Sequence, residues 1–492
     1  MEFRELLAGT DVVEIAGDAA TEISGLAYDS RRVDPGALFF CVRGHLSDGH
    51  DFAQEAVDRG AGALVVERPL DLPVPQARVA DARAAMAPIA VRFWRDPTAL
   101  LRVAGVTGTN GKTTTAYLIR HVLEAEGVPT GLLGTVKRVV GGVEEEVERT
   151  TPEAVDLQAT FRRMLDAGDR ACAMEVSSHA LALGRTAGVR FAVAVFTNLT
   201  QDHLDFHRDM EDYFQAKRGL FFPPPLATIV NLDDPYGARL AAELEGVGQR
   251  LVTFSASGAD GADFRALDAA FDASGSRFRC AGPRGEVEVR TPLPGDFNVE
   301  NALAAVSACD ALGVGYEVAA ATLADAGRVP GRFEPVDAGQ RFAVLVDYAH
   351  TPDSLENVLS AARRLTAGRL IAVFGCGGDR DQQKRPLMGE IAARISDACV
   401  VTSDNPRSEE PEAIIREILS GIPGPRNGVR VEPDRRSAIA AALAEAAPGD
   451  TVVIAGKGHE QGQEFAGGRK IPFDDRDVAL QELARLRSGS RA

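Results

Sequence analysis

The feature that most constrains the fold of this chain is a glycine-rich loop at residues 105–113, which reads GVTGTNGKT. A run of Leu, Val and Ala from Leu100 precedes it, and apolar residues at helical spacing follow it as far as Gly127. Glycines let backbone N–H groups approach phosphate oxygens, and the start of a helix adds positive potential. We therefore predict a phosphate loop, in which Lys112 reaches the β- and γ-phosphates of ATP and the Thr113 hydroxyl binds Mg²⁺.

The spacing of this loop differs from the common pattern G-x-x-x-x-G-K-[ST], because Val106 occupies the first glycine position. The alternative interpretation is a glycine-rich turn that binds no ligand, and the flanking strand and helix make it the weaker one. The residues that we expect to contact the nucleotide here are Gly108, Thr109, Asn110, Gly111, Lys112, Thr113 and Thr114.

Composition narrows the class of protein. The 492 residues carry 54 Lys and Arg against 71 Asp and Glu, a net charge of −17, which disfavours binding to nucleic acid or to an anionic membrane. Six scattered cysteines without a C-x-x-C pair predict buried thiols in a reducing compartment. No apolar run is long enough to span a membrane, and the N-terminus does not resemble a signal peptide, so we expect a cytoplasmic protein.

The chain alternates apolar runs of strand length with polar or helix-like segments, which predicts an α/β protein. Asp96-Pro97 and Pro330-Gly331 interrupt this pattern and mark two boundaries. We expect a small N-terminal α/β domain at 1–97, a central phosphate-loop domain at 98–329 and a C-terminal Rossmann-like domain at 330–492. In the last of these, polar loops follow four buried strands and are expected to converge on one crevice.

Two polar residues at strand ends are candidate metal ligands in the central domain. Glu175 ends the apolar run ACAMEV, and His203 follows the run FAVAVF. Mg²⁺ prefers few protein oxygens together with phosphates and water, so Glu175 suits it well and His203 less so. Each could instead be structural. The chain has only six lysines, and Lys112, Lys217, Lys384 and Lys457 all lie in or beside motif-like segments.

Eleven ordered segments resemble the Mur ligase family over nearly the whole chain. They are GVTGTNGKTTT at 105–115, TTPEAVDLQ at 150–158, EVSSHALALGR at 175–185, TNLTQDHLDFH at 197–207, YFQAKRGLF at 213–221, GDFNVENALAA at 295–305, GRFE at 331–334, DYAHTPDSLE at 347–356, GCGGDRDQQKRP at 375–386, DNPR at 404–407 and GKGHE at 456–460. The resemblance implies an ATP-dependent, amide-forming ligase of peptidoglycan precursor synthesis that works through an acyl phosphate.

The resemblance also implies roles for individual residues. The UDP-muramoyl dipeptide would be held by Ser30, His45, Thr150, Thr151, Ser177 and Arg185. Further contacts to ATP would come from Asn298, Asn301, Arg332 and Asp347, although Asn301 could equally be a buried amide joining a loop to a helix. Leu183 departs from the family, because some members have Gln there, and one substrate hydrogen bond is therefore in question.

The resemblance further implies that Lys217 reacts with CO₂ to form a carbamate, which helps to hold Mg²⁺ together with Thr113, Glu175 and His203. We expect meso-2,6-diaminopimelate as the amino acid, held by Arg385, Asp404, Asn405, Pro406, Arg407, Gly456 and Glu460. Its distal carboxylate can pair bidentately with the Arg407 guanidinium.

Other interpretations remain open. L-lysine or L-ornithine could replace diaminopimelate, but neither offers Arg407 a distal carboxylate. A folylpolyglutamate synthetase would lack DNPR and the UDP-binding first domain. A simple phosphate-loop ATPase or regulatory module would explain residues 105–127 alone. We expect small-molecule substrates, no nucleic acid partner and a monomer.

Overall fold

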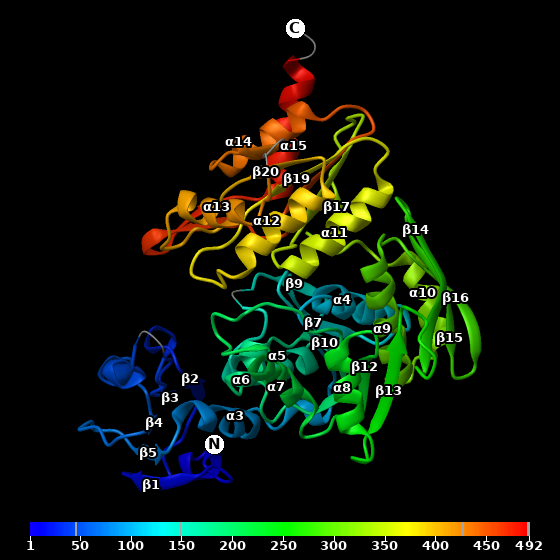
Figure 1. Cartoon of the computed structure of the whole chain (residues 1–492). Helices are drawn as coiled ribbons and strands as arrows, with labels where there is room; N and C mark the ends of the chain where they lie inside the picture. Colours follow the sequence, from blue (N-terminus) through cyan, green and yellow to red (C-terminus); the bar gives the residue numbers. More distant parts are fainter. Residues whose placement is uncertain (45–46, 148, 425–427, 490–492) are drawn as a thin grey trace. The chain divides into compact units, whose positions relative to one another are not determined.

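The computed structural model describes residues 1–44, 47–147, 149–424 and 428–489 (Figure 1). They form two compact units, each assembled from separate stretches of the chain. The first unit comprises residues 1–105, 127–192 and 219–225, and the second comprises residues 106–126, 193–218 and 226–492. The domain boundaries expected near residues 97 and 330 stay predictions.

The first unit begins with a five-stranded sheet of order β1-β5-β4-β3-β2, in which only β1 is antiparallel to its neighbour. Both β3 and β4 consist wholly of buried apolar residues, as strands covered on both faces require. The elements are α1 (Phe3–Leu6), β1 (Val12–Ala16), β2 (Gly25–Ala27), β3 (Ala37–Phe40), α2 (Ala53–Asp58), β4 (Ala63–Val66), β5 (Gln76–Val79) and α3 (Ala82–Phe93).

The remainder of the first unit contains the strand that carries Glu175. Here β10 pairs in parallel with β7, and β8 and β9 continue as antiparallel strands. The elements are β7 (Thr130–Leu133), β8 (Arg138–Val140), β9 (Val143–Glu145), α5 (Ala154–Asp166), β10 (Ala171–Glu175) and α6 (Ser178–Ala182). Two strands, β6 (Arg102–Thr107) and β11 (Phe191–Phe196), have residues in both units.

The second unit contains the phosphate loop and the helix that follows it. Its strands β11, β12, β13 and β14 pair in parallel, and β15 and β16 add an antiparallel extension. The elements are α4 (Lys112–Ala125), α7 (Met210–Arg218), β12 (Ala227–Asn231), α8 (Pro235–Leu244), β13 (Arg250–Ser255), β14 (Phe264–Asp272), β15 (Gly275–Gly282), β16 (Gly285–Thr291), α9 (Asp296–Ala311) and α10 (Tyr316–Thr322).

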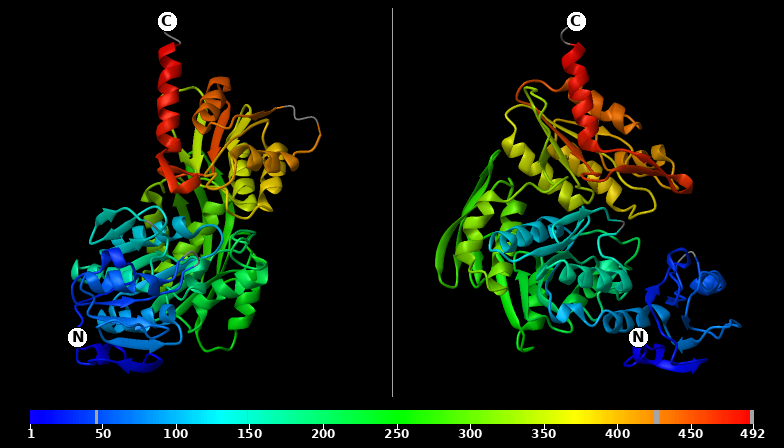
Figure 2. Two further views of the ribbon diagram at one scale, coloured as in Figure 1. Left: turned by 90° about the vertical axis from the view of Figure 1, so that its left-hand side faces the viewer. Right: turned by 180° about the vertical axis from the view of Figure 1, so that it is seen from behind.

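The same unit ends in a second sheet of order β17-β18-β22-β19-β20-β21, parallel except for β17. Figures 1 and 2 show it between two layers of helices. The elements are β17 (Glu334–Pro335), β18 (Ala343–Asp347), α11 (Pro352–Leu365), β19 (Leu370–Phe374), α12 (Lys384–Ile395), β20 (Ala398–Val401), α13 (Pro411–Ser420), β21 (Val429–Val431), α14 (Arg435–Glu445), β22 (Thr451–Ala455), β23 (Gly462–Phe465), β24 (Arg469–Pro472) and α15 (Asp475–Gly489).

Alternate residues of these strands pack into two separate cores. On one face, residues such as Ala372 and Phe374 pack with helices α11, α12 and α13. On the other face, Ile371 and Val373 pack with α14 and α15. Because both faces are covered, the polar groups of the strand-end loops can gather only at the edge where the parallel strands end.

Two expectations about the whole chain can be compared with this structure. The six cysteines are free and buried, which confirms the prediction of buried thiols. No helix in the described part of the chain combines the length and the apolar composition needed to cross a bilayer.

Replacing Leu359 tests the core beneath the C-terminal sheet. Leu359 lies on α11 and is fully buried, so Leu359→Ala is expected to lower the free energy of unfolding by about 2–5 kcal/mol through lost packing and a residual cavity. Urea unfolding followed by circular dichroism measures the change. Leu387→Ala is the control, because Leu387 is 44% exposed and its loss should cost less than about 0.5 kcal/mol. Equal losses would contradict this account of the core.

Candidate active site

Two glycines give the phosphate loop its shape. Gly108 and Gly111 have φ values of +153° and +86°, which side-chain-bearing residues rarely adopt. A Cβ atom on Gly108 would lie 1.8 Å from Thr197 Oγ1, and one on Gly111 would lie 2.4 Å from Asn301 Oδ1. The loop is therefore pressed against neighbouring segments at both points, and only glycine fits.

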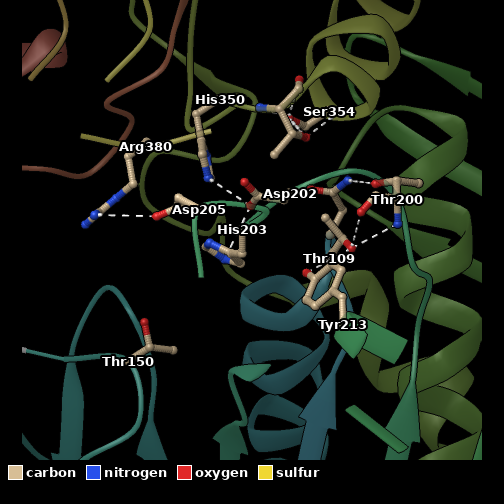
Figure 3. Close-up of polar contacts among 12 residues, drawn as sticks. Thr109, Thr150, Thr200, Asp202, His203, Asp205, Tyr213, His350, Ser354 and Arg380 are labelled. Carbon is tan, nitrogen blue, oxygen red and sulfur yellow. Dashed lines mark hydrogen bonds and ion pairs between the residues drawn. The ribbon is translucent and has the colours of Figure 1, made fainter. Parts of the chain in front are cut away.

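Hydrogen bonds from the segment after β11 hold the loop in this shape. Asn110 donates its backbone N–H to Asn198 Oδ1 over 2.8 Å, and its carbonyl accepts from Thr197 Oγ1 over 2.6 Å. Thr109 Oγ1 donates to the carbonyl of Thr200 over 3.1 Å (Figure 3). These protein contacts order the loop, which reduces the entropy lost when a phosphate binds.

Two lysine side chains lie against this loop. Lys112 Nζ donates to the carbonyls of Gly108 and Thr109 over 3.0 and 2.9 Å. Lys217 Nζ donates to the same Gly108 carbonyl over 2.7 Å and lies 4.6 Å from the centre of the Tyr213 ring. Two basic side chains therefore lie against the loop, and contact of Lys112 with phosphate stays a prediction.

The ammonium group of Lys217 is in an unfavourable environment for a charge. Its side chain is buried, with 1% of the residue exposed. Burial, followed by the positive charge of Lys112, holds the pKa of Lys217 well below its ordinary value, and the carboxylate of Asp202 offsets only part of this shift. A larger share of neutral amine, which is the nucleophilic form, is therefore present than in an exposed lysine.

A buried carboxylate, Asp202, lies at the centre of a group of basic side chains. Its oxygens lie 3.3 Å from His203 Nε2, 3.7 Å from His350 Nε2 and 3.4 Å from Lys384 Nζ (Figure 3). Burial alone would raise the pKa of Asp202, but the charges of Lys384 and His203 outweigh it and lower the pKa well below the ordinary value. The ionised carboxylate joins the loop after β11 to two loops of the C-terminal sheet.

Asp202 and His350 were not among the site residues predicted from sequence. The scarcity of lysine drew attention to Lys384, but no role could be given to it. Both Asp202 and His350 lie inside motifs already identified, TNLTQDHLDFH and DYAHTPDSLE. The signal that could have found them is their position after buried strands, where polar side chains collect.

Further contacts bring the C-terminal sheet to the phosphate loop. Arg332 Nη2 donates to Thr113 Oγ1 over 3.0 Å, and its guanidinium lies 4.5 Å from the centre of the Tyr348 ring. Asn110 Nδ2 donates to Asp353 Oδ2 over 2.6 Å. Asp347 accepts backbone N–H groups from Phe333 and Ala349 over 2.6 and 2.7 Å, so here its carboxylate orders the loop.

The side-chain amides of the two asparagines of α9 form hydrogen bonds with other groups of the protein. Asn298 Nδ2 donates to the Pro294 carbonyl over 2.9 Å, and Asn301 Nδ2 donates to Asn298 Oδ1 over 3.1 Å. Asn301 Oδ1 accepts from Thr115 Oγ1 over 3.4 Å. These bonds match the alternative in which a buried amide joins elements, and contact with ATP stays a prediction for both residues.

The turn at 404–407 and the loop at 456–460 share one polar network. Lys457, which is fully buried, donates to Asn405 Oδ1 and to Glu460 Oε2, both over 2.8 Å. Asn405 Nδ2 also donates to Glu460 Oε2, over 2.9 Å. The structure therefore brings together Asn405 and Glu460, and it adds Lys457 as the group that joins them.

Arg407 is fixed at the end of this network. Its Nε donates to Glu464 Oε2 over 3.0 Å and its Nη1 donates to the Gly378 carbonyl over 2.7 Å. Its backbone φ is +50°, next to Pro406. The side chain is 23% exposed, so the guanidinium is both held in place and accessible.

Arg385 needs a correction. Its guanidinium is fully buried and donates to Glu409, Glu417 and the carbonyl of Gly377, all within 3.1 Å. Such a paired group braces its loop and does not suit direct contact with an incoming amino acid. Arg380 of the same motif has a side chain 49% exposed. Sequence could not separate the two arginines, because both lie in GCGGDRDQQKRP.

In the first unit, four predicted residues meet at the end of β10. Glu175 accepts the backbone N–H and the hydroxyl of Thr135 over 2.7 and 3.0 Å. Thr151 Oγ1 donates to the Glu175 carbonyl over 2.9 Å and accepts the Ser177 N–H over 3.2 Å. Arg185 Nη1 donates to the Thr151 carbonyl over 3.2 Å.

A cavity of about 300 Å³ lies nearby in the same unit, with Tyr28, Arg32, Arg149, Thr150 and Arg163 in its lining. Glu146, Glu153 and Asp156 also line it, so cationic and acidic side chains surround the one predicted residue, Thr150. Outside this lining, Ser30 Oγ donates to Glu55 Oε2 over 2.9 Å. His45 lies outside the described residues.

These observations first define a structural class: α/β proteins in which a glycine-rich loop leads from a strand into a helix and is contacted by loops of a second parallel sheet. Three family models then match consecutive parts of the chain: "Mur ligase family, catalytic domain" at residues 22–95, "Mur ligase middle domain" at 106–309, and "Mur ligase, glutamate ligase domain" at 331–458. The chain belongs to the Mur ligase family. It is a ligase with the three-domain α/β fold of that family, as the sequence predicted.

Relatives named UDP-N-acetylmuramoyl-L-alanyl-D-glutamate--2,6-diaminopimelate ligase match over nearly full length. The protein of Clostridioides difficile is 43% identical across 99% of this chain and 100% of its own, and that of Gloeobacter violaceus is 49% identical across 99% of both. A solved structure of the same name is 32% identical with a TM-score of 0.69, covering 99% of each chain. A folylpolyglutamate synthase of Mycobacterium tuberculosis, 18% identical over 82% of this chain and 95% of its own, shares only the fold, with a TM-score of 0.62.

Gly108→Ala tests the role of the phosphate loop. The added Cβ would collide with Thr197 Oγ1, so the loop must move, and we expect the affinity for ADP to fall at least tenfold, or ~1.4 kcal/mol. Isothermal titration with ADP measures the effect. Gly127→Ala is the matched control, because Gly127 also has a positive φ but meets open space. Unchanged affinity in Gly108→Ala would contradict the assignment of this loop.

Proposed function

We propose that this ligase joins meso-2,6-diaminopimelate to UDP-N-acetylmuramoyl-L-alanyl-D-glutamate, using ATP. The observation that carries the proposal is the Arg407 guanidinium, held by Glu464 and Gly378 yet accessible, beside the Asn405, Lys457 and Glu460 network. A fixed guanidinium suits the distal carboxylate of the amino acid, and Glu460 suits its ammonium group. The relatives named above carry the same activity in their names.

The reaction has two steps. The D-glutamate carboxylate attacks the γ-phosphorus of ATP, and the bond from that phosphorus to the β-phosphate oxygen breaks. ADP departs, and the dipeptide now carries an acyl phosphate. The amine of diaminopimelate then attacks the acyl carbon and loses a proton, and phosphate leaves from the tetrahedral intermediate. Anionic groups approach each other in the first step, so the catalytic contribution of Lys112 is to offset their repulsion.

The residues proposed to hold Mg²⁺ fit that ion's chemistry. Thr113 and Glu175 offer hydroxyl and carboxylate oxygens, His203 a ring nitrogen, and Lys217 would offer two more oxygens as a carbamate. Among the described residues, no group of three His, Cys, Asp or Glu side chains is arranged to hold a metal ion. When bound, Mg²⁺ would neutralise phosphate charge.

The proposed Lys217 carbamate depends on the neutral, nucleophilic form of the lysine amine. The neutral nitrogen adds to the carbon of CO₂ and releases one proton, which converts a cationic side chain into an anionic one. Burial and the charge of Lys112 lower the pKa of Lys217, so a larger share of the reactive neutral form is present than in an exposed lysine. Lys217 Nζ already lies 2.7 Å from the Gly108 carbonyl, within the phosphate loop region.

The UDP-muramoyl dipeptide is proposed to occupy the first unit. The cavity is lined by Thr150 and by both arginine and acidic side chains, so it can take a polar ligand. Thr151, Ser177 and Arg185 lie in one hydrogen-bonded group with Glu175. We place the reaction in the cytoplasm, where ATP is available and the six thiols stay reduced. We also propose that the protein acts as a monomer.

Arg407→Met tests the choice of amino acid. Lysine and ornithine lack a distal carboxylate, so wild-type protein should release phosphate from ATP with the UDP-muramoyl dipeptide and diaminopimelate far faster than with either. Loss of a charge-assisted bond is worth about 1.5–3 kcal/mol, so the variant should lose about tenfold to a hundredfold of its kcat/KM preference for diaminopimelate over lysine.

Arg416→Met is the control for that measurement. Arg416 is exposed on α13, and its Nε donates to the Glu412 carbonyl one turn earlier in the same helix. This variant should keep the wild-type preference. If wild-type protein used lysine as readily as diaminopimelate, or if Arg407→Met kept the preference, the proposed specificity would be wrong.

The pH dependence of carbamate formation tests Lys217. Because its pKa is lowered, the neutral amine forms at lower pH than in an ordinary lysine, and labelling by isotopic bicarbonate should persist at pH values where exposed lysines are protonated. Magnetic resonance of the labelled carbon in wild-type protein and in Lys217→Arg measures it. Lys470→Arg, which removes an exposed lysine of β24, should retain the signal. A wild-type signal that survives in Lys217→Arg would refute the assignment.

A further inference from the structure

A fully buried ion pair of the C-terminal sheet lies beside the residues proposed to bind the amino acid. Arg435 begins α14 and Asp475 begins α15, and the two residues are 1% and 0% exposed. Arg435 Nε donates to Asp475 Oδ1 over 2.8 Å, and Nη2 donates to Oδ2 over 2.7 Å. This two-point geometry is the kind that can offset the cost of burying both charges.

The other contacts of Arg435 are with the two substrate-facing turns. Nη2 donates to the carbonyl of Ala455 over 3.0 Å, and Nη1 donates to the carbonyl of Ser403 over 3.4 Å. Ala455 is the last residue of β22 and precedes Gly456, while Ser403 precedes Asp404. One guanidinium therefore fixes the backbone immediately before both turns.

The side chain of Asp404 is part of the same arrangement. Its Oδ2 lies 3.9 Å from Arg435 Nη1 and, among the described residues, has no hydrogen-bond partner although it is buried. Gly456 has a φ of +120°, and a Cβ atom there would lie 2.6 Å from this oxygen. The glycine thus lets an ionised, unpartnered oxygen approach the second turn.

The charges around Asp404 keep it ionised. Burial alone would raise its pKa, but Lys457 and then Arg435 outweigh burial and lower it. An unpartnered buried carboxylate oxygen costs free energy unless a donor arrives. The ammonium group of an amino acid is such a donor.

We propose that Arg435, held by Asp475, is a positioning residue for the amino-acid subsite: it sets the backbone of both turns and directs Asp404 toward the incoming amino acid. This inference rests on the proposed function. Arg435 touches no substrate itself, and its effect passes through Asp404 and Gly456.

If Arg435 had a purely structural role, that role would be to attach α15 to α14. The next residue, Arg436, already attaches these two helices. Arg436 Nη1 donates to Glu482 Oε1 over 2.6 Å, and Nη2 donates to Gln481 over 2.6 Å. This second link joins the same two helices, but its arginine side chain is 37% exposed and its hydrogen bonds run to α15 rather than to either turn. Arg436 is therefore a matched control in position, residue type and helix pair.

The test measures KM for diaminopimelate, ATP and the UDP-muramoyl dipeptide, together with kcat and the thermal midpoint. Arg435→Lys keeps the charge but cannot reach both oxygens and both carbonyls, and Asp475→Asn keeps the shape but removes the charge. Each is expected to raise KM for diaminopimelate at least tenfold, with KM for ATP changed less than twofold. Arg436→Lys and Glu482→Gln should leave all three KM values within twofold of wild type.

A double-mutant cycle shows whether the effect passes through Asp404. Adding Arg435→Lys to Asp404→Asn should raise KM for diaminopimelate much less than adding it to wild type, because the shared partner is already gone. If Arg435→Lys fails to fold, Asp475→Asn replaces it in the cycle. The effect of Asp475→Asn on KM is then compared between wild type and Asp404→Asn.

The outcomes separate the two proposals. Wild-type protein that shows no phosphate release with any diamino acid overturns the proposed function and this inference together. Active wild-type protein with unchanged KM for diaminopimelate in Arg435→Lys and Asp475→Asn overturns the inference alone. The inference also fails if those variants lose only thermal stability, or if the effects of Arg435 and Asp404 simply add.

Discussion

Buried cations at the carboxyl ends of parallel strands are the constraint on which the rest of the second unit depends. Lys217, Lys384, Arg385, Arg435 and Lys457 are each less than 5% exposed. A buried charge costs several kcal/mol unless it is paired and hydrogen-bonded, so the surrounding loops must supply carboxylates and carbonyls in fixed positions. Meeting that requirement orders the loops before any substrate arrives. The same contacts therefore stabilise the fold and shape the site.

The five cations differ in the groups that pair with their positive charge. This difference separates residues that hold loops in place from the residue proposed to react. Arg435 pairs with Asp475, Arg385 with Glu409 and Glu417, Lys384 with Asp202, and Lys457 with Glu460. Lys217 instead donates to a carbonyl and has Lys112 as a like-charged neighbour. The four paired cations hold loops in place. The pKa of Lys217 is lowered, and covalent chemistry is proposed for this residue.

Sequence predicted the parts of this arrangement that are local in the chain. The phosphate loop, the α/β class and the polar loops after buried strands all depend on short-range patterns, and the loops around Lys112, Asn405 and Glu460 lie where those patterns placed them. Ion pairs between residues far apart in the chain could not be predicted from these patterns. Arg435 and Asp475 are 40 residues apart and look like ordinary charged residues at helix starts, and Arg385 could not be told from Arg380 until burial separated them. Whether a charge is buried depends on tertiary packing, which no spacing within a motif encodes.

This distribution of charge also resolves a conflict between the protein's net charge and that of its substrates. The chain carries a net charge of −17, yet ATP, the UDP-muramoyl dipeptide and a dicarboxylic amino acid are all rich in negative charge. Salt screens charges on the surface beyond about 10 Å, so distant acidic groups repel a bound ligand only weakly. Charges inside the protein are screened much less, so an inner cation that is not neutralised by a carboxylate acts more strongly on a bound ligand. A few lysines and arginines near the loops can therefore attract a bound anionic ligand more strongly than the distant acidic surface repels it. This requires that the partner carboxylate of each cation does not neutralise its charge on the side that faces the ligand. Arg407 meets that condition in a particular way: Glu464 and the Gly378 carbonyl take Nε and Nη1, which fixes the plane of the guanidinium while its exposed portion stays open to a carboxylate.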